Sequence, residues 1–112
     1  MNNSCIFCKI IAKEVPCTPV YETDDILVIK DLYPKAPIHY LIIPKKHAKD
    51  IQDLAHDDMH LGASMIKVAK ELSAQLPGTG DFKLVVNSGE GSGQSIFHLH
   101  MHFVAGKQLG EI

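Results

Sequence analysis

The chain has 112 residues, of which 46% are hydrophobic and 21% are charged, and its formal net charge at pH 7 is -2. This length predicts one domain, residues 1–112, with enough apolar residues to form a core. The charge offers no basic patch for non-specific binding of nucleic acids or anionic membranes. No apolar run approaches the roughly 20 residues that cross a membrane, and the N-terminus does not resemble a signal peptide. We therefore expect a cytoplasmic protein that binds neither nucleic acids nor membranes.

The N-terminal part of the sequence predicts a short helix and two strands. Ser4 is a candidate N-cap for a helix over 5–13. Prolines that follow this helix favour extended backbone. Residues rich in β-branched side chains predict strands over 26–31 and 39–43, and their short connection indicates an antiparallel pair.

The C-terminal part predicts one long helix and two further strands. Apolar residues at helical spacing predict a helix over 57–76, and the Pro-Gly pair after it ends that helix. Strands are expected over 82–86 and 97–105, with a glycine-rich loop over 87–95 between them. The fold class is therefore α+β, with a largely antiparallel sheet. The apolar stripe of the long helix consists of Leu61, Met65, Val68 or Ala69, Leu72 and Leu76.

Three histidines, His98, His100 and His102, alternate with apolar residues in the segment 98–104. On a strand they would share one face at intervals of about 6.5–7 Å, while the residues between them anchor the other face to the core. A His-rich solvent face and a metal site made by all three are alternatives. The spacing is wide for one ion, because zinc ligands lie about 2 Å from the metal. It favours catalysis by an imidazole, which near pH 7 is neutral and nucleophilic.

The glycine-rich loop directly precedes these histidines. Its backbone N–H groups are unhindered by side chains and can surround an anion, and Asn87 and Ser95 add side-chain donors. A mobile connection between strands is the alternative. Beside the histidines, the loop indicates phosphoryl or nucleotidyl transfer through a phospho-histidine intermediate.

The end of the first long strand suits a nucleoside. Ile29 and Asp31 are two residues apart and so lie on the same face. An apolar wall next to a carboxylate can hold a base and accept hydrogen bonds from both ribose hydroxyls.

The three histidines followed by two apolar residues resemble the signature of the histidine triad (HIT) family, and further segments resemble its Hint-like branch. These segments cover 10–16, 30–39, 43–47 and 93–95. The resemblance implies a HIT-like fold with a five-stranded sheet, one long and one short helix, and two subunits forming a homodimer. It implies hydrolysis of purine nucleoside phosphoramidates and aminoacyl adenylates through a covalent nucleotidyl-histidine, with release of AMP or GMP.

The resemblance also implies roles for individual residues. His100 would be the nucleophile, His102 would hold phosphate oxygens, and His39 would support the nucleophile. Ser95 would join them in the catalytic group. The expected nucleotide-binding residues are Phe7, Ile10, Val15, Ile29, Asp31, Leu32, Leu41, Asn87, Gly93, Gln94, Ser95, His100 and His102.

Cys5 and Cys8 form a C-x-x-C pair at the start of the short helix, where two thiols can grip one tetrahedral ion. By itself the pair is equally compatible with buried thiols or a redox dithiol. Zinc-containing relatives resemble this chain in combining such a pair with the equivalents of His47 and His98. This resemblance implies a structural Zn²⁺ held by all four residues, and we expect no organic cofactor.

Two other functions use the same sequence features. One is a diadenosine polyphosphate hydrolase, which would release AMP with ADP or ATP. The other is a non-catalytic, zinc-stabilised nucleotide-binding adaptor module. A third thiol, Cys17, lies near two prolines and is expected to be free.

Overall fold

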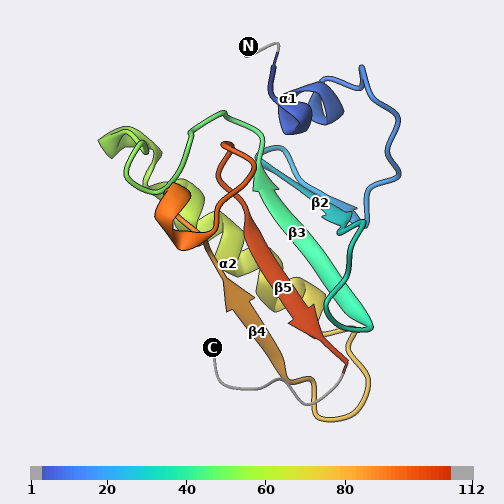
Figure 1. Ribbon diagram of the computed structural model, residues 1–112. Helices are drawn as coiled ribbons and strands as arrows, with labels where there is room; N and C mark the ends of the chain where they lie inside the picture. The colour runs from blue at the N-terminus through green and yellow to red at the C-terminus, as the bar shows by residue number, and fades with distance from the viewer. Residues whose placement is uncertain (1–3, 107–112) are drawn as a thin grey trace.

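The computed structural model describes residues 4–106, which form an antiparallel sheet with helices against its two faces (Figure 1). The five strands lie in the order β1-β2-β3-β5-β4 and every neighbouring pair is antiparallel, so the α+β expectation is confirmed. The strands are β1 (Tyr21–Glu22), β2 (Ile26–Lys30), β3 (Ile38–Pro44), β4 (Phe82–Val85) and β5 (Met101–Ala105). The helices are α1 (Ile6–Ile11), α2 (His60–Ser73) and two 3-10 turns, η1 (His56–Asp58) and η2 (Glu90–Ser92).

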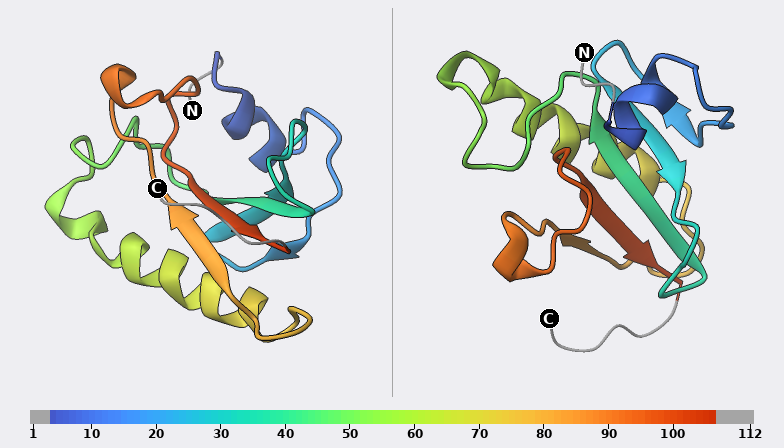
Figure 2. Two further views of the ribbon diagram at one scale, coloured as in Figure 1. Left: turned by 60° about the horizontal axis from the view of Figure 1, so that its bottom comes forward. Right: turned by 45° about the horizontal axis from the view of Figure 1, so that its top comes forward.

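The two faces of the sheet carry separate apolar clusters. Figure 2 shows α1 and α2 on opposite sides of the sheet. On one face, Val28, Ile42 and Phe103 pack against α2 through the stripe expected from the sequence. On the other face, Leu41 and Ile43 pack against α1. Strands β2 and β3 are therefore covered on both sides, which explains their nearly continuous apolar sequences. None of the described helices is both long and apolar enough to cross a membrane.

The last strand begins later than expected. It starts at Met101 rather than at residue 97, so His98 and His100 precede it. The cause is a long-range hydrogen bond: the Leu99 N–H donates to the carbonyl of Ala48 at 2.8 Å, which ties this segment to a loop instead of to the sheet. The alternation of faces still holds. Leu99 packs in the apolar cluster between the sheet and α2. His98 and His100 lie on the opposite side, where both rings contact Phe7 of α1.

Both predicted helices are shorter than expected. The N-cap of α1 is Cys5 and not Ser4, because the Cys5 sulfur accepts the N–H of Cys8 at 3.3 Å. The long helix is expected over 57–76. Its first residues form η1 instead, and after Ser73 the backbone bonds three residues back in tighter turns. Strands β2 and β4 start at the expected residues and end one residue earlier, and β3 is one residue longer at each end. Strand β1 was not predicted from the local pattern.

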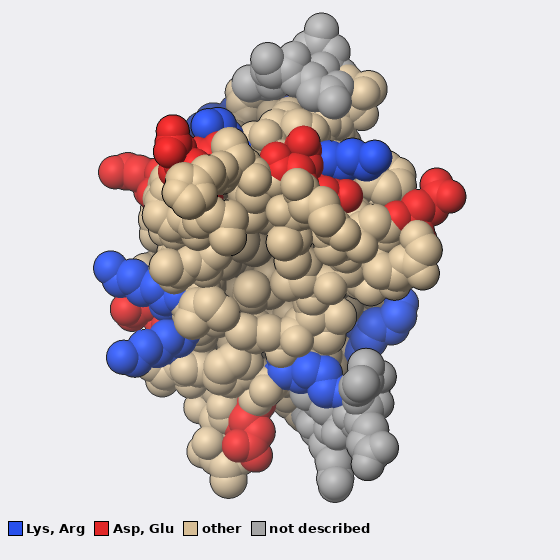
Figure 3. Space-filling view, turned by 90° about the vertical axis from the view of Figure 1, so that its left-hand side faces the viewer, with Lys and Arg blue, Asp and Glu red and all other residues tan. Residues whose placement is uncertain are grey.

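Charged side chains of both signs are interspersed on the face of the molecule drawn in Figure 3. They lie around its periphery and leave an uncharged centre. The described residues therefore form no basic patch on this face.

Gly106 follows β5 and has a φ of 98°, a region that L side chains rarely adopt. A Cβ there would lie 3.0 Å from the Cβ of Pro37. We predict that Gly106→Ala lowers the free energy of unfolding by about 1–3 kcal/mol, measured in urea. Gly62→Ala is the matched control: this helical glycine has nothing within 4 Å of the position that an added methyl group would take. That change should stabilise α2 by about 0.5–1 kcal/mol. Equal effects of the two substitutions would contradict the prediction.

Candidate functional site

A pocket of about 860 Å³ opens on the α1 side of the sheet. It is lined from α1, the loop after β2, strands β3 and β5, and the glycine-rich loop. The structure thus brings together most of the residues expected from the sequence. These are Phe7, Ile10, Ile29, Asp31, Leu32, His39, Leu41, Asn87, Gly93, Gln94, Ser95, His100 and His102.

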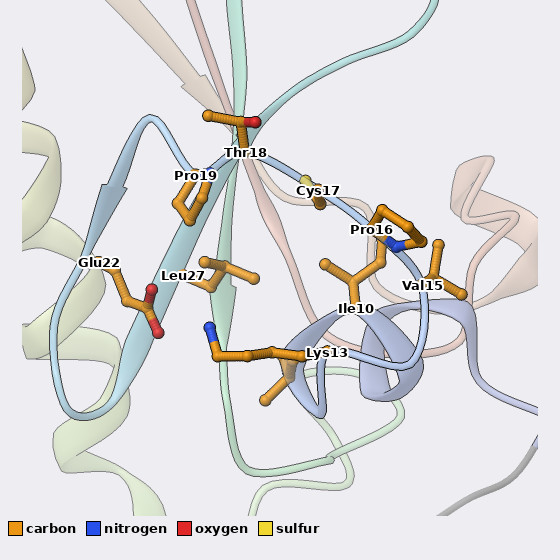
Figure 4. A pocket seen from close by; sticks show the side chains of 10 residues that line it. Ile10, Lys13, Val15, Pro16, Cys17, Thr18, Pro19, Glu22 and Leu27 are labelled. Carbon is orange, nitrogen blue, oxygen red and sulfur yellow. The ribbon is translucent and has the colours of Figure 1, made fainter.

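Val15 is the one expected residue that does not line this pocket. It lines a second pocket of about 320 Å³, together with Leu27 and Cys17 (Figure 4). Lys13 has a φ of 65° just after α1, and this left-handed residue turns the chain before Val15 is reached. Ile10 lies between the two pockets and lines both.

His100 presents one unprotonated nitrogen to the main pocket. Its Nδ1 lies 2.7 Å from the carbonyl oxygen of His98, and because a carbonyl only accepts, Nδ1 carries the proton. The lone pair of the neutral ring is therefore on Nε2. The ring is buried, and its edge packs against Phe7 with 5.2 Å between centroids. This arrangement fixes the tautomer of a nucleophilic imidazole without a carboxylate.

A second chain of hydrogen bonds fixes the proton of His102. The backbone N–H of Lys35 donates to Nδ1 of His39 at 3.0 Å, so the proton of a neutral His39 is on Nε2. That nitrogen lies 2.9 Å from Nδ1 of His102, which accepts. His102 therefore carries its proton on Nε2. No group between residues 4 and 106 bonds to this Nε2, so it is available as a donor to a ligand.

The sequence predicts that His39 supports the nucleophile, and the structure places its hydrogen bond on His102 instead. Asp31 completes the group, with its Oδ2 at 3.4 Å from Nε2 of His39 and 4.0 Å from Nδ1 of His102. Its other oxygen, Oδ1, accepts the backbone N–H of Tyr33 at 2.8 Å. Asp31 is thus held in place at the edge of the pocket.

Burial keeps these rings neutral. Burial, and after it the neighbouring His100, His39 and Lys35, lower the pKa of His102 to about 4 against the opposing charge of Asp31. Burial also lowers the pKa of His39, with Asp31 raising it and Lys35 lowering it. At pH 7 both rings therefore act as hydrogen-bonding groups and not as cations.

The side chain of Gln94 holds the glycine-rich loop in place through hydrogen bonds. Its Oε1 accepts the N–H of Gly89 at 2.8 Å, and its Nε2 donates to the carbonyls of Lys49 and Ile96 at 2.8 and 2.9 Å. The amide of this buried side chain is thus already used inside the protein. Asn87 also braces the loop, because its Nδ2 donates to the carbonyl of Ser92 at 2.8 Å.

An apolar wall leads from α1 to the histidines. Ile29 lies opposite Leu41, and Leu41 lies opposite His102, in neighbouring strands. Phe7 covers this wall from α1 and is buried. Leu32 stands at the rim and is 86% exposed. A ligand whose flat apolar group packs on this wall would bring its polar end to the imidazoles.

Four further side chains converge beneath α1 with the geometry of a zinc site. Nδ1 of His98 lies 3.3 Å from Sγ of Cys5, 3.6 Å from Sγ of Cys8 and 3.1 Å from Nδ1 of His47. Nδ1 of His47 lies 3.3 Å from Sγ of Cys8. Ligand atoms around a tetrahedral zinc are about 3.3–3.8 Å apart, so the four residues fit this ion. His98 donates from Nε2 to the carbonyl of Pro44 at 2.7 Å, which directs its Nδ1 lone pair into the cluster.

Asp31, His39 and His102 also lie within 4.8 Å of one another through their ligand atoms, but they fit a metal less well. Nδ1 of His39 already accepts the N–H of Lys35. A metal on Nε2 would then require a ring without any proton, whereas metal-bound histidine ordinarily donates from its other nitrogen. This group holds a proton between its rings, and the Cys-His cluster is the better metal site.

Sequence reasoning did not identify two groups that hydrogen-bond to the histidine rings, the N–H of Lys35 and the carbonyl of Pro44. Both are backbone groups, so residue types carry no signal for them. The only available signal was positional: Lys35 lies four residues before His39, and Pro44 is the last residue of β3, the strand that contains His39.

The chain is similar to known proteins over nearly its whole length. Residues 4–111 match the family model described as "Scavenger mRNA decapping enzyme C-term binding". An uncharacterized HIT-like protein of Chlamydia trachomatis is 43% identical over 107 residues, which cover 96% of each chain. The crystal structure of a HIT family hydrolase from Legionella pneumophila has a TM-score of 0.88 and 42% identity, covering 95% of this chain and 96% of that one. A zinc-bound histidine triad family protein from Mycobacterium smegmatis has a TM-score of 0.76 and 30% identity, covering 90% of this chain and 73% of that one.

We predict that His102 stays neutral well below pH 6 and holds its proton on Nε2, as ring resonances in a ¹⁵N NMR titration would show. Because burial lowers its pKa from 6.5 to about 4, the unfolded chain binds this proton more readily than the folded one. The contribution of His102 to stability is therefore present above pH 6.5 and is lost as the pH falls towards 4. A ring protonated on Nδ1, or a midpoint near 6.5, would contradict the assignment.

Proposed function

Because the chain belongs to the histidine triad (HIT) family, we propose that it is a hydrolase of purine nucleoside phosphoramidates and aminoacyl adenylates, releasing AMP or GMP. The observation that supports this best is the fixed tautomer of His100. Its Nε2 lone pair faces a pocket that also offers an N–H donor from His102. A nucleophile next to a donor is the minimum that transfer of a nucleotidyl group requires.

In the first step, Nε2 of His100 attacks the α-phosphorus, and the P–N or P–O bond to the leaving group breaks. The leaving amine departs with a proton from solvent. The imidazole ring becomes cationic, and its Nδ1–H then donates a charge-assisted hydrogen bond to the carbonyl of His98. Nε2–H of His102 donates to a phosphate oxygen as negative charge grows on it.

In the second step, a water molecule attacks the same phosphorus. The bond to Nε2 of His100 breaks, the hydroxyl stays on phosphorus, and the proton returns to solvent. AMP or GMP is released and the original tautomer of His100 is restored. Ser95 lines the pocket and would support the phosphate or the leaving amine, as would the backbone of the loop near Gly93.

The nucleoside would lie on the wall formed by Ile29 and Leu41, under Phe7 and Ile10. Asp31 stands where this wall meets the histidines. Its carboxylate would accept hydrogen bonds from the ribose hydroxyls. The apolar wall and Asp31 would thus bind the nucleoside, which stays in the AMP product.

We also propose that two copies of the chain associate. Strand β4 is an edge of the sheet, since it pairs only with β5 among the described residues. Phe82 on this strand is 37% exposed. The face in Figure 3 has an uncharged centre, and the centres of protein interfaces are depleted in charged residues. A second copy would satisfy the edge of the sheet.

Replacement of His100 by Ala should reduce turnover of an AMP phosphoramidate by at least ~10⁴-fold, because the nucleophile is lost. Mass spectrometry of the wild type after brief exposure to substrate should show a nucleotidyl adduct that His100→Ala lacks. Release of ADP or ATP from dinucleotides, at rates above phosphoramidate hydrolysis, would instead identify a diadenosine polyphosphate hydrolase. Unchanged turnover in His100→Ala would refute the mechanism.

We further propose that Cys5, Cys8, His47 and His98 hold a structural zinc ion, supported by the donor geometry and by the zinc-bound mycobacterial relative. The ion would join α1 to the segment before β5. Metal analysis should find one zinc per chain in the wild type and in Cys17→Ser, an exposed-thiol control. Cys8→Ser should lose at least ~10-fold in zinc affinity and unfold at lower temperature, since structural zinc contributes folding free energy. Equal zinc content in both variants would contradict the assignment.

A further inference from the structure

The loop between β2 and β3, residues 31–37, supplies the hydrogen bond that orients two histidines of the main pocket. Within it, the backbone N–H of Lys35 donates to Nδ1 of His39 at 3.0 Å. Without this donor, a neutral His39 would be free to carry its proton on Nδ1 and to turn the lone pair of Nε2 towards His102. His102 would then donate from its own Nδ1 and present a lone pair to the pocket. Since phosphate oxygens accept hydrogen bonds, His102 would no longer bind them.

The two halves of this loop are held in different ways. The N–H of Asp31 donates to the carbonyl of His39 at 3.0 Å, and Oδ1 of Asp31 accepts the N–H of Tyr33 at 2.8 Å. The first half is thus hydrogen-bonded to β3 and to itself. In the second half, Pro37 has a φ that its ring fixes, and Ala36 is buried. The donor N–H belongs to this second half, so its position depends on how the loop packs against its neighbours.

Gly106 packs on the second half of the loop. Strand β5 ends at Ala105, which lies opposite Ile38 at the start of β3, so the end of β5 is beside this loop (Figure 1). A Cβ on Gly106 would lie 3.0 Å from Cβ and 3.3 Å from Cγ of Pro37, and 3.5 Å from the backbone N of Ile38. Pro37 lies midway in the sequence between the donor and the acceptor of the hydrogen bond. Neither Gly106 nor Pro37 lines the main pocket, so their contact affects the pocket through the loop.

We propose that Gly106 is a positioning residue for the proposed hydrolase. Its close approach to Pro37 holds the N–H of Lys35 in place. That N–H fixes the proton of His39, and His39 in turn keeps His102 a donor to the phosphate. The inference rests on the proposed function, because it concerns a donor to the phosphate that is transferred.

A side chain at position 106 would displace the loop. At 3.0 Å two carbon atoms repel each other strongly, because their optimal separation is about 3.5–4.0 Å. Ile38 is held by its pairing with Ala105, whereas Pro37 is exposed, so Pro37 is the residue that gives way. The N–H of Lys35 then moves relative to the ring of His39, and the hydrogen bond between them weakens.

The test compares Gly106→Ala with Gly80→Ala. Gly80 also has a positive φ, 76°, but an added Cβ would lie 3.9 Å from the nearest neighbouring atom, so this control strains the backbone away from the loop. In ¹⁵N NMR spectra, the wild type and Gly80→Ala should hold the protons of His39 and His102 on Nε2. In Gly106→Ala a measurable fraction of both protons should move to Nδ1. The kcat for an AMP phosphoramidate should fall by at least ~10-fold in Gly106→Ala and stay at the wild-type value in Gly80→Ala.

Two further measurements separate this contact from a general loss of structure. Gly106→Asn also places a Cβ against Pro37, but asparagine tolerates a positive φ better than alanine does. This variant should therefore be more stable than Gly106→Ala and show the same movement of protons. Adenosine should bind to all variants with the wild-type Kd, since the N–H of Asp31 anchors this carboxylate to β3.

Unchanged proton positions in both Gly106 variants would overturn the proposal, as would an equal loss of kcat in Gly80→Ala. Weaker binding of adenosine to Gly106→Ala would also overturn it, because the whole pocket would then have moved. A wild type that hydrolyses no phosphoramidate refutes the proposed function, and the NMR comparison still decides the role of Gly106. Hydrolysis by the wild type, with a fall in kcat that leaves the protons of the variants in place, refutes the role of Gly106 alone.

Discussion

The backbone and ring of His98 connect the two chemical centres of this molecule. Its carbonyl accepts the Nδ1–H of His100, its Nε2 donates to Pro44, and its Nδ1 faces the two cysteines and His47. The first contact sets the tautomer of His100, the proposed nucleophile, and the other two hold the His98 carbonyl in position for that hydrogen bond. A disturbance of the Cys-His cluster would therefore move the hydrogen-bond partner of His100, although none of the four cluster side chains lines the main pocket.

Backbone groups, and not carboxylates, fix the protons of His100 and His39, the latter bonded to His102. The carbonyl of His98 holds the proton of His100 on Nδ1, and the N–H of Lys35 places the proton of His39 towards His102. Backbone groups do not titrate, so these partners keep their donor and acceptor roles as the pH changes. The depressed pKa of His102 has the same consequence, since a ring that stays neutral keeps one donor and one acceptor.

Local patterns were sufficient to predict four of the five strands, the long helix and the placing of His98, His100 and His102 on one face; the fifth strand, β1, came only from the family resemblance. The alternation around His100 directs Leu99 to the α2 side even though β5 starts later than expected. What local patterns could not supply were contacts between distant segments. The hydrogen bond from Leu99 to Ala48 delays the start of the strand, and the bond from His39 to His102 depends on the register of β3 and β5. Val15 lines the second pocket and not the main one, and the left-handed residue Lys13 turns the chain before it.

The proposed chemistry depends on one atom, Nε2 of His100, forming the bond to phosphorus. Trapping the nucleotidyl enzyme with labelled histidine and recording ³¹P and ¹⁵N NMR spectra would locate the phosphorus on a single ring nitrogen. We expect coupling between phosphorus and Nε2 of His100 while Nδ1 keeps its proton. Phosphorus on Nδ1, or on any other residue, would show that the nucleophile is wrongly assigned.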